Sequence, residues 1–145
     1  MAIHLTTELD TAIRAHGEET FPNECCGFML GTLDGQDRRV SELLRADNER
    51  EDEEQYHRFL IPPETYMKGE KTARNKGLDI LGFYHSHPNA PARPSQYDLD
   101  HAWPFYSYVI VSIMDAASDA MTSWILKDDR SKFDEEAIAI SGDGA

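Results

Sequence analysis

The chain has 145 residues and carries 14 Lys and Arg against 27 Asp and Glu, which gives a formal net charge of −13. Because a nucleic-acid backbone is itself a polyanion, this balance speaks against a DNA- or RNA-binding protein. There is no run of about 18 apolar residues and no basic-then-apolar N-terminus, so we expect no membrane span, no signal peptide and, by default, a cytoplasmic protein. The two cysteines, Cys25 and Cys26, are adjacent, which does not suggest a disulfide framework.

The pattern of apolar residues and turn formers predicts an α/β protein with one domain over residues 1–140 and a flexible tail over 141–145. The elements expected in chain order are a helix capped by Thr7 and running to about Glu19, strands over 26–33 and 38–44 joined at Asp34-Gly35, a short strand over 58–61, a helix opened by Pro62-Pro63 and stopped by Gly77, a strand over 78–84, a short helix from Ser95, strands over 106–113 and 121–127, and an edge strand at Ile138 and Ile140.

Much of the acidic excess lies in one segment, from Asp47 to Glu54. Runs of like charge are typical of solvated loops, and this is the first interpretation here. The same segment could instead help to recruit a basic carrier protein, since electrostatic steering needs only the opposite sign. The sequence leaves this choice and the oligomeric state open.

The stretch that ends in His85-Ser86-His87-Pro88 carries the strongest chemical signal. Residues 78–84 are apolar and rich in strand formers, so the histidines are expected where a buried strand ends. Side chains two apart on a strand share a face, which directs His85 and His87 to one point and Ser86 away from it. Pro88 then removes a backbone donor and ends the strand.

A proline-rich loop returns the chain toward these histidines. Ser95 follows it, and Asp98 lies three residues later, so both fall on one side of the first turn of a helix. Two imidazoles and one carboxylate, with a fourth position for water, form the ligand set of a catalytic zinc site. Taken singly, a histidine on an apolar strand is more often a packed residue, and Ser-x-x-Asp is also an ordinary helix cap.

Other metal-dependent hydrolases fit the chain poorly. A barrel amidohydrolase needs about 250 residues, which this chain does not have. Cytidine-type deaminases carry His-x-Glu followed by Pro-Cys-x-x-Cys, whereas Cys25 and Cys26 are adjacent and lie upstream of the histidines. The helical His-Glu-x-x-His motif of many zinc proteases is absent.

A zinc hydrolase also needs a proton shuttle, and Glu24 is the candidate. It stands directly before the apolar run that starts at Cys25-Cys26-Gly27. A glutamate at the edge of a buried strand suits a general base that takes a proton from water and returns it to a leaving amine.

Glu24, His85-Ser86-His87-Pro88, the seven-residue gap from His87 to Ser95, and Ser95-x-x-Asp98 together resemble the JAMM (MPN-domain) zinc metallopeptidases. The segments around Ala92-Arg93-Pro94 and Trp103-Pro104 are similar to the small prokaryotic branch, which includes peptidases acting on ubiquitin-like sulfur-carrier proteins. The resemblance implies a mixed β-sheet flanked by helices, in a three-layer arrangement like that of the cytidine deaminases.

The resemblance also implies a role for each motif residue. His85, His87 and Asp98 would bind Zn²⁺, Glu24 would be the general base and later the acid, and Ser95 would donate its hydroxyl to the oxyanion. The implied reaction is hydrolysis of a peptide or isopeptide bond in the C-terminal tail of a ubiquitin-like or sulfur-carrier protein. A deubiquitinase-like isopeptidase acting on conjugates, and a non-catalytic binding module stabilised by its metal, remain as alternatives.

Overall fold

The computed structural model describes residues 2–35, 37–46 and 63–141, apart from the side chains of residues 63, 97 and 101. The strand expected over 58–61, the acidic segment from Asp47 to Glu54, and residues 142–145 of the expected tail lie outside the described part. Ser141 is the last residue of a strand and pairs with Thr6.

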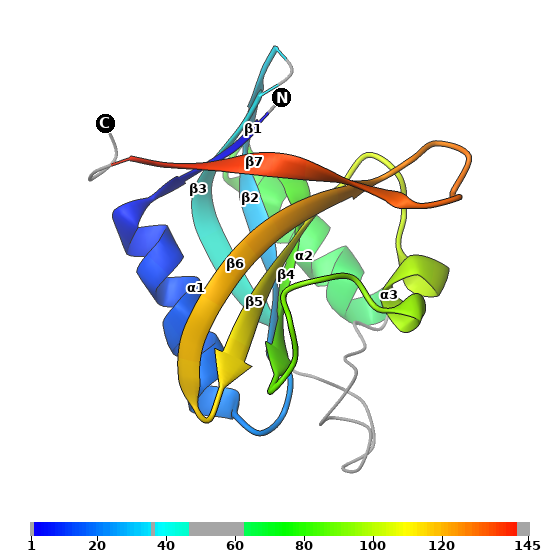
Figure 1. Ribbon diagram of the computed structural model, residues 1–145. Coiled ribbons are helices and arrows are strands. Elements are labelled where there is room, and N and C mark those ends of the chain that lie inside the picture. Colours follow the sequence, from blue (N-terminus) through cyan, green and yellow to red (C-terminus); the bar gives the residue numbers. More distant parts are fainter. Residues whose placement is uncertain (1, 36, 47–62, 142–145) are drawn as a thin grey trace.

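The described residues form strands and helices close to those expected (Figure 1). They are β1 Ala2–Thr6, α1 Thr7–Thr20, β2 Cys26–Asp34, β3 Asp37–Ala46, α2 Pro63–Asn75, β4 Asp79–Pro88, α3 Gln96–His101, β5 Ser107–Met114, β6 Ala117–Leu126 and β7 Phe133–Ser141. The β2–β3 hairpin, the two helices after it and the histidine-bearing strand are confirmed. Strand β6 begins earlier than predicted, at Ala117.

The strands close into a barrel in the order β1-β3-β2-β4-β5-β6-β7. The barrel contains both parallel pairs (β1 with β3 and β7, and β4 with β5) and antiparallel ones, so the expected mixed sheet is confirmed. The strand expected at Ile138 and Ile140 is present as part of β7, but its prediction as an edge strand is wrong, because β7 pairs with both β6 and β1. Figure 1 shows β7 running beside β1 where the barrel closes.

Strand β1 is the element that the sequence did not predict, and it is the one that closes the barrel. It has five residues, in which Ile3 and Leu5 are buried and alternate with partly buried neighbours. The helix that follows is capped by Thr6, whose hydroxyl accepts the Leu9 N–H at 3.1 Å, rather than by Thr7. Five residues next to a strong helix start give too short a period-two pattern to identify a strand.

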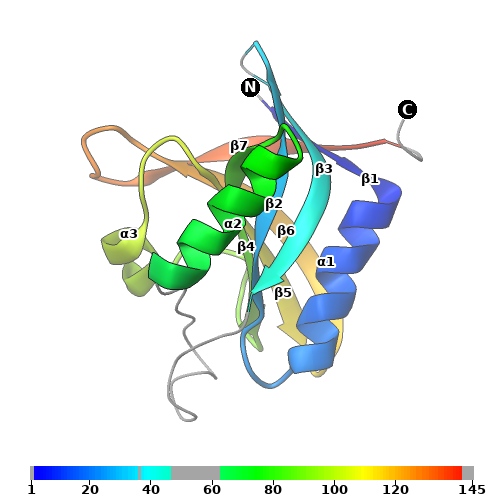
Figure 2. The same ribbon diagram turned by 180° about the vertical axis from the view of Figure 1, so that it is seen from behind.

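The central strands β2 and β4 bury both faces. One face packs with Ile13 of α1, and the other packs with Ala73 of α2. Figure 2 shows α2 lying over β2 and β4, the two strands that it contacts. Helices therefore cover both faces of these strands, while the outer strands curl round to form the barrel in place of the expected three flat layers. None of the described helices is both long and apolar enough to cross a bilayer.

Candidate metal centre

Strand β4 carries both motif histidines on one face. It continues to Pro88, so His85 and His87 lie within the strand, with only 1% and 8% of their surfaces exposed. Their Nε2 atoms are 3.1 Å apart. Ser86 lies on the opposite face, where its hydroxyl accepts the Cys25 N–H at 2.8 Å and its own N–H donates to the Cys25 carbonyl at 3.3 Å. The alternation of the strand thus brings the two imidazoles together, as the spacing predicts.

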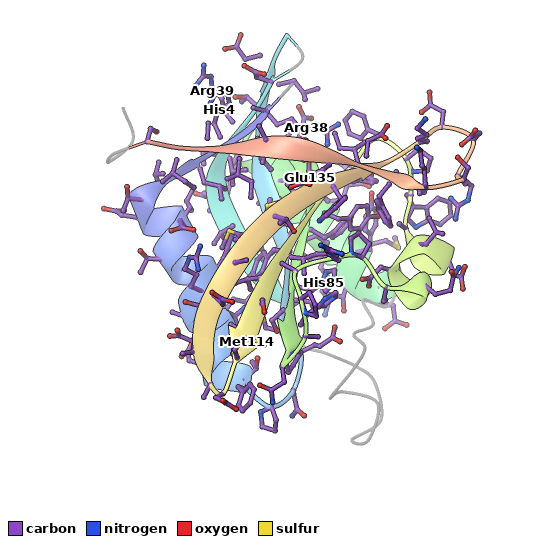
Figure 3. The ribbon with its side chains drawn as sticks, viewed as in Figure 1. His4, Arg38, Arg39, His85, Met114 and Glu135 are labelled. Carbon is purple, nitrogen blue, oxygen red and sulfur yellow. The ribbon has the colours of Figure 1, made fainter. Side chains whose placement is uncertain are left out.

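The third donor comes from the first turn of α3. Oδ1 of Asp98 lies 3.4 Å from Nε2 of His85, and Oδ2 lies 3.3 Å from Nε2 of His87. Ligand atoms of the three residues all lie within 4.8 Å of one another. Figure 3 shows His85 projecting from β4 on the side where α3 lies. Two ring nitrogens and a carboxylate gathered in this way can hold a divalent ion.

Neighbouring backbone groups orient these donors. The Nδ1 of His87 lies 2.9 Å from the Pro91 carbonyl, which can only accept, so Nδ1 carries the proton and Nε2 keeps its lone pair. The Ser95 N–H donates to Oδ2 of Asp98 at 2.8 Å. Outer partners of this kind fix the tautomer and the direction of metal ligands. The three residues therefore suit a zinc ion: they offer nitrogen and oxygen ligands, the Nε2 of His87 has a free lone pair, and hydrogen bonds hold His87 and Asp98 in place.

The electrostatics favour the ligand forms of the side chains. Burial lowers the pKa of His85, and the nearby Asp98 carboxylate offsets this only in part, so the ring is neutral at neutral pH. Burial by itself would raise the pKa of Asp98, but the interactions with His85 and His87 and the Ser95 N–H outweigh it and hold that pKa well below its usual range. A neutral imidazole beside an ionised carboxylate is the state that binds a metal.

Glu24 lies at the entry to β2 and is 4% exposed. The antiparallel pairing of β2 with β4 sets Cys26 opposite His85, and the backbone bond from Ser86 extends that pairing by one residue. Glu24 is the residue next to Cys25, so its backbone lies near the end of β4 that carries the histidines. Glu24 is thus a buried acidic residue near the histidine-bearing strand, and its role as general base stays a prediction.

Ser95 is the N-cap of α3. Its hydroxyl oxygen accepts the Asp98 N–H at 3.1 Å, and Asp98 returns the bond to the Ser95 N–H in a capping box. The cap uses a lone pair of the hydroxyl and leaves its hydrogen available for an acceptor. Because Ser95 is exposed, that acceptor can be a bound substrate. Capping and donation to an oxyanion are therefore compatible.

The loop from β4 to α3 is held by residues that sequence reasoning missed. The hydroxyls of Ser112 and Thr122, on β5 and β6, donate to the carbonyls of Ala90 and Ala92, each at 2.6 Å. The carbonyl between them is the one that accepts the His87 proton. No local signal marks Ser112 or Thr122, because their role depends on the packing of strands remote in sequence.

Cys25 and Cys26 are buried, and the two residues are not joined in a disulfide. Burial raises the pKa of Cys25 to about 11, so the unreactive thiol form dominates at neutral pH.

We expect iodoacetamide at pH 8 to leave Cys25 unmodified in the native protein and to modify it fully in the denatured protein, as measured by peptide mass spectrometry. Rapid labelling of Cys25 in the folded state would instead indicate an accessible thiolate and favour cysteine chemistry.

Comparison with known proteins agrees with this geometry. The family model described as prokaryotic homologs of the JAB domain matches residues 6–127, a range that includes all five motif residues. A desampylase from Haloferax volcanii is 30% identical over 115 residues, which cover 76% of this chain and 80% of that protein. A probable TtuB-protein conjugate cleaving protease from Thermus thermophilus is 40% identical over 52 residues, 36% of this chain and 35% of the relative.

The fold agrees with that of a solved relative. The solution structure of a Desulfitobacterium hafniense protein matches with a TM-score of 0.85 and 32% sequence identity, over 99% of this chain and 94% of that one. The family model spans most of the chain and the motifs lie within the matched range. The chain therefore belongs to the prokaryotic JAB-domain family, the small prokaryotic branch of the JAMM/MPN proteins, which confirms the resemblance found in its motifs.

Proposed function

We propose that this protein is a zinc-dependent peptidase that hydrolyses a peptide or isopeptide bond at the C-terminal tail of a ubiquitin-like, sulfur-carrier type of protein. The observation that carries the proposal is the convergence of ligand atoms from His85, His87 and Asp98 within 4.8 Å. The kind of substrate is supported by the relatives, a desampylase and a probable conjugate cleaving protease. The second of these also favours isopeptide-linked conjugates as an alternative substrate.

The metal and the protein would divide the chemistry. Zinc held by His85, His87 and Asp98 would lower the pKa of water from about 16 to roughly 7 and polarise the scissile carbonyl. Glu24 accepts the proton of the attacking water as the new C–O bond forms, and it then returns that proton to the leaving amine as the C–N bond breaks. The Ser95 hydroxyl donates to the oxyanion that develops on the carbonyl oxygen.

Ser95→Ala is expected to lower kcat by about 10²- to 10³-fold, the typical effect of losing one oxyanion donor. Loss of the cap is a separate effect, and it costs about 1 kcal/mol of stability. Ser95→Asn provides the control, because asparagine caps a helix as well as serine does but places its donor elsewhere. Steady-state kinetics on both variants separates the two roles. Wild-type kcat in Ser95→Ala would exclude the hydroxyl from the reaction.

The proposed function is tested with a ubiquitin-like carrier that ends in Gly-Gly, either extended by a short C-terminal peptide or linked to a lysine side chain. Incubation with the zinc-loaded protein is expected to release the carrier with a free Gly-Gly terminus, detected by intact mass spectrometry. If both substrates stay intact under conditions where the protein holds one zinc ion, the peptidase proposal fails and a binding module becomes the better account.

A further inference from the structure

Arg93 occupies a defined place beside the metal centre. It lies in the loop from β4 to α3, two residues before Ser95, and its side chain is exposed. Its backbone N–H donates to the Pro91 carbonyl at 2.8 Å, and the same oxygen accepts the His87 Nδ1 proton at 2.9 Å. The Arg93 backbone is therefore connected to a candidate metal ligand through a single shared oxygen atom.

The backbone that carries Arg93 is firmly held. The preceding residue, Ala92, is buried and its carbonyl accepts the Thr122 hydroxyl. The following residue is Pro94, and a residue before proline is restricted to extended conformations. Arg93 is thus an exposed side chain on a backbone that hydrogen bonds and the following proline hold in place.

The guanidinium of Arg93 has no partner among the described residues, although the chain has 27 acidic residues against 14 basic ones. The other described arginines all have one: Arg14 with Asp10, Arg38 with the Leu81 carbonyl and Ser107, Arg39 with Asp34, Arg45 with Glu19, Arg74 with Glu70, and Arg130 with the Trp103 ring. Arg93 consequently keeps its planar set of donors for a ligand. The ligand that matches this fork in shape and charge is a carboxylate, which it can bind through two hydrogen bonds.

The chemistry of the proposed reaction supplies such a carboxylate at one end of the substrate. If the leaving group is a single amino acid or a very short peptide, it carries a free α-carboxylate close to the scissile bond. A lysine in the middle of an isopeptide-linked chain carries none there, since its α-carboxyl group is part of the backbone. An arginine beside the metal centre can distinguish these two classes of leaving group.

We infer that Arg93 binds the α-carboxylate of the leaving group, so that the preferred substrate is a carrier tail ending in a single residue or a very short extension. The inference rests on the proposed function and narrows it. The guanidinium also offsets the repulsion that a chain of net charge −13 exerts on an anionic leaving group. In this role Arg93 is a specificity determinant that takes no part in proton transfer.

The test compares two carriers that differ in one group: Gly-Gly-Ala with a free carboxylate, and the same tail ending in a carboxamide. The zinc-loaded wild type is expected to cleave the acid with a kcat/KM about 10-fold or more above that of the amide, since a charged hydrogen bond is lost with the amide. Arg93→Gln should lower kcat/KM for the acid by a similar factor and leave the amide unchanged. Arg93→Lys should keep part of the preference for the acid over the amide, because lysine retains the positive charge but lacks the two parallel N–H donors of the guanidinium.

Arg74→Gln is the matched control, because Arg74 is an exposed arginine on α2 that pairs with Glu70. It should leave both substrates unaffected. Binding without turnover is measured by calorimetry with Glu24→Gln and with the double variant Glu24→Gln, Arg93→Gln. Adding Arg93→Gln should weaken binding of the carrier that ends in a carboxylate and leave binding of the carboxamide carrier unchanged.

Two results would overturn the inference while leaving the peptidase intact. They are equal cleavage of the acid and the amide by wild type, and an equal loss on both substrates in Arg93→Gln. Cleavage of neither carrier by the wild type would remove the proposed function together with the inference.

Discussion

Glu24→Gln is expected to lower kcat by about 10²- to 10⁴-fold while bound zinc stays at the wild-type level. Glutamine keeps the size of the side chain and its hydrogen-bonding ability but cannot take a proton from water. Because Glu24 is not among the residues whose ligand atoms converge, the metal site should be unaffected. Single-turnover kinetics gives the rate, and elemental analysis of the same sample gives the zinc content.

Glu136→Gln is a suitable control for this variant. Glu136 is also buried, with 7% of its surface exposed, but it lies on β7 and accepts the Ser123 hydroxyl at 2.6 Å. This variant can lose stability but should keep the activity of the folded protein. Near-normal kcat in Glu24→Gln would assign proton transfer to another group, and a parallel loss of zinc would place Glu24 in the metal site.

Asp98→Asn is expected to remove bound zinc and activity together. The substitution keeps the shape of the side chain and an acceptor for the Ser95 N–H, so the capping box of α3 can persist. It removes the negative charge that Asp98 places against the two imidazoles. Metal affinity should fall because two neutral nitrogens and an amide oxygen are a poorer site for zinc than a set with a carboxylate. Zinc per protein, measured by elemental analysis after dialysis, should drop well below one.

Asp100→Asn controls for a lost charge on the same helix. Asp100 is exposed, and its carboxylate accepts the Gln96 amide at 2.8 Å, away from the histidines. This variant should keep both zinc and activity. His87→Ala should behave like Asp98→Asn, since it removes the ring that the Pro91 carbonyl orients. Wild-type zinc content in either ligand variant would show that the metal is held elsewhere.

The sequence predicts those contacts of the site that form between residues two or three positions apart in the chain. His85 and His87 share a face because strand side chains alternate, and Ser95 meets Asp98 because a helix cap joins positions three apart. Both patterns act within a few residues of chain. The approach of the α3 carboxylate to the β4 histidines spans a longer loop, and its prediction rested on the proline-rich loop and the ligand types before the resemblance to a known family supported it.

The parts that the sequence does not reveal depend on contacts between distant residues. The barrel closes through the parallel pairing of β1 with β7, in which Ile3 lies opposite Ile138. Ser112 and Thr122 hold the loop through hydroxyls that are indistinguishable in sequence from any other on a strand. That the guanidinium of Arg93 has no partner within the described part of the chain becomes apparent only from the structure.

Metal-dependent cleavage is tested most directly by titrating zinc into the chelator-treated protein in the presence of a carrier with an extended Gly-Gly tail. We expect the metal-free protein to leave the carrier intact, and cleavage to rise with added zinc and level off near one ion per chain, with Asp98→Asn inactive at the same zinc concentration. Full cleavage by the metal-free wild type, with no response to zinc, would contradict a metal centre built from His85, His87 and Asp98.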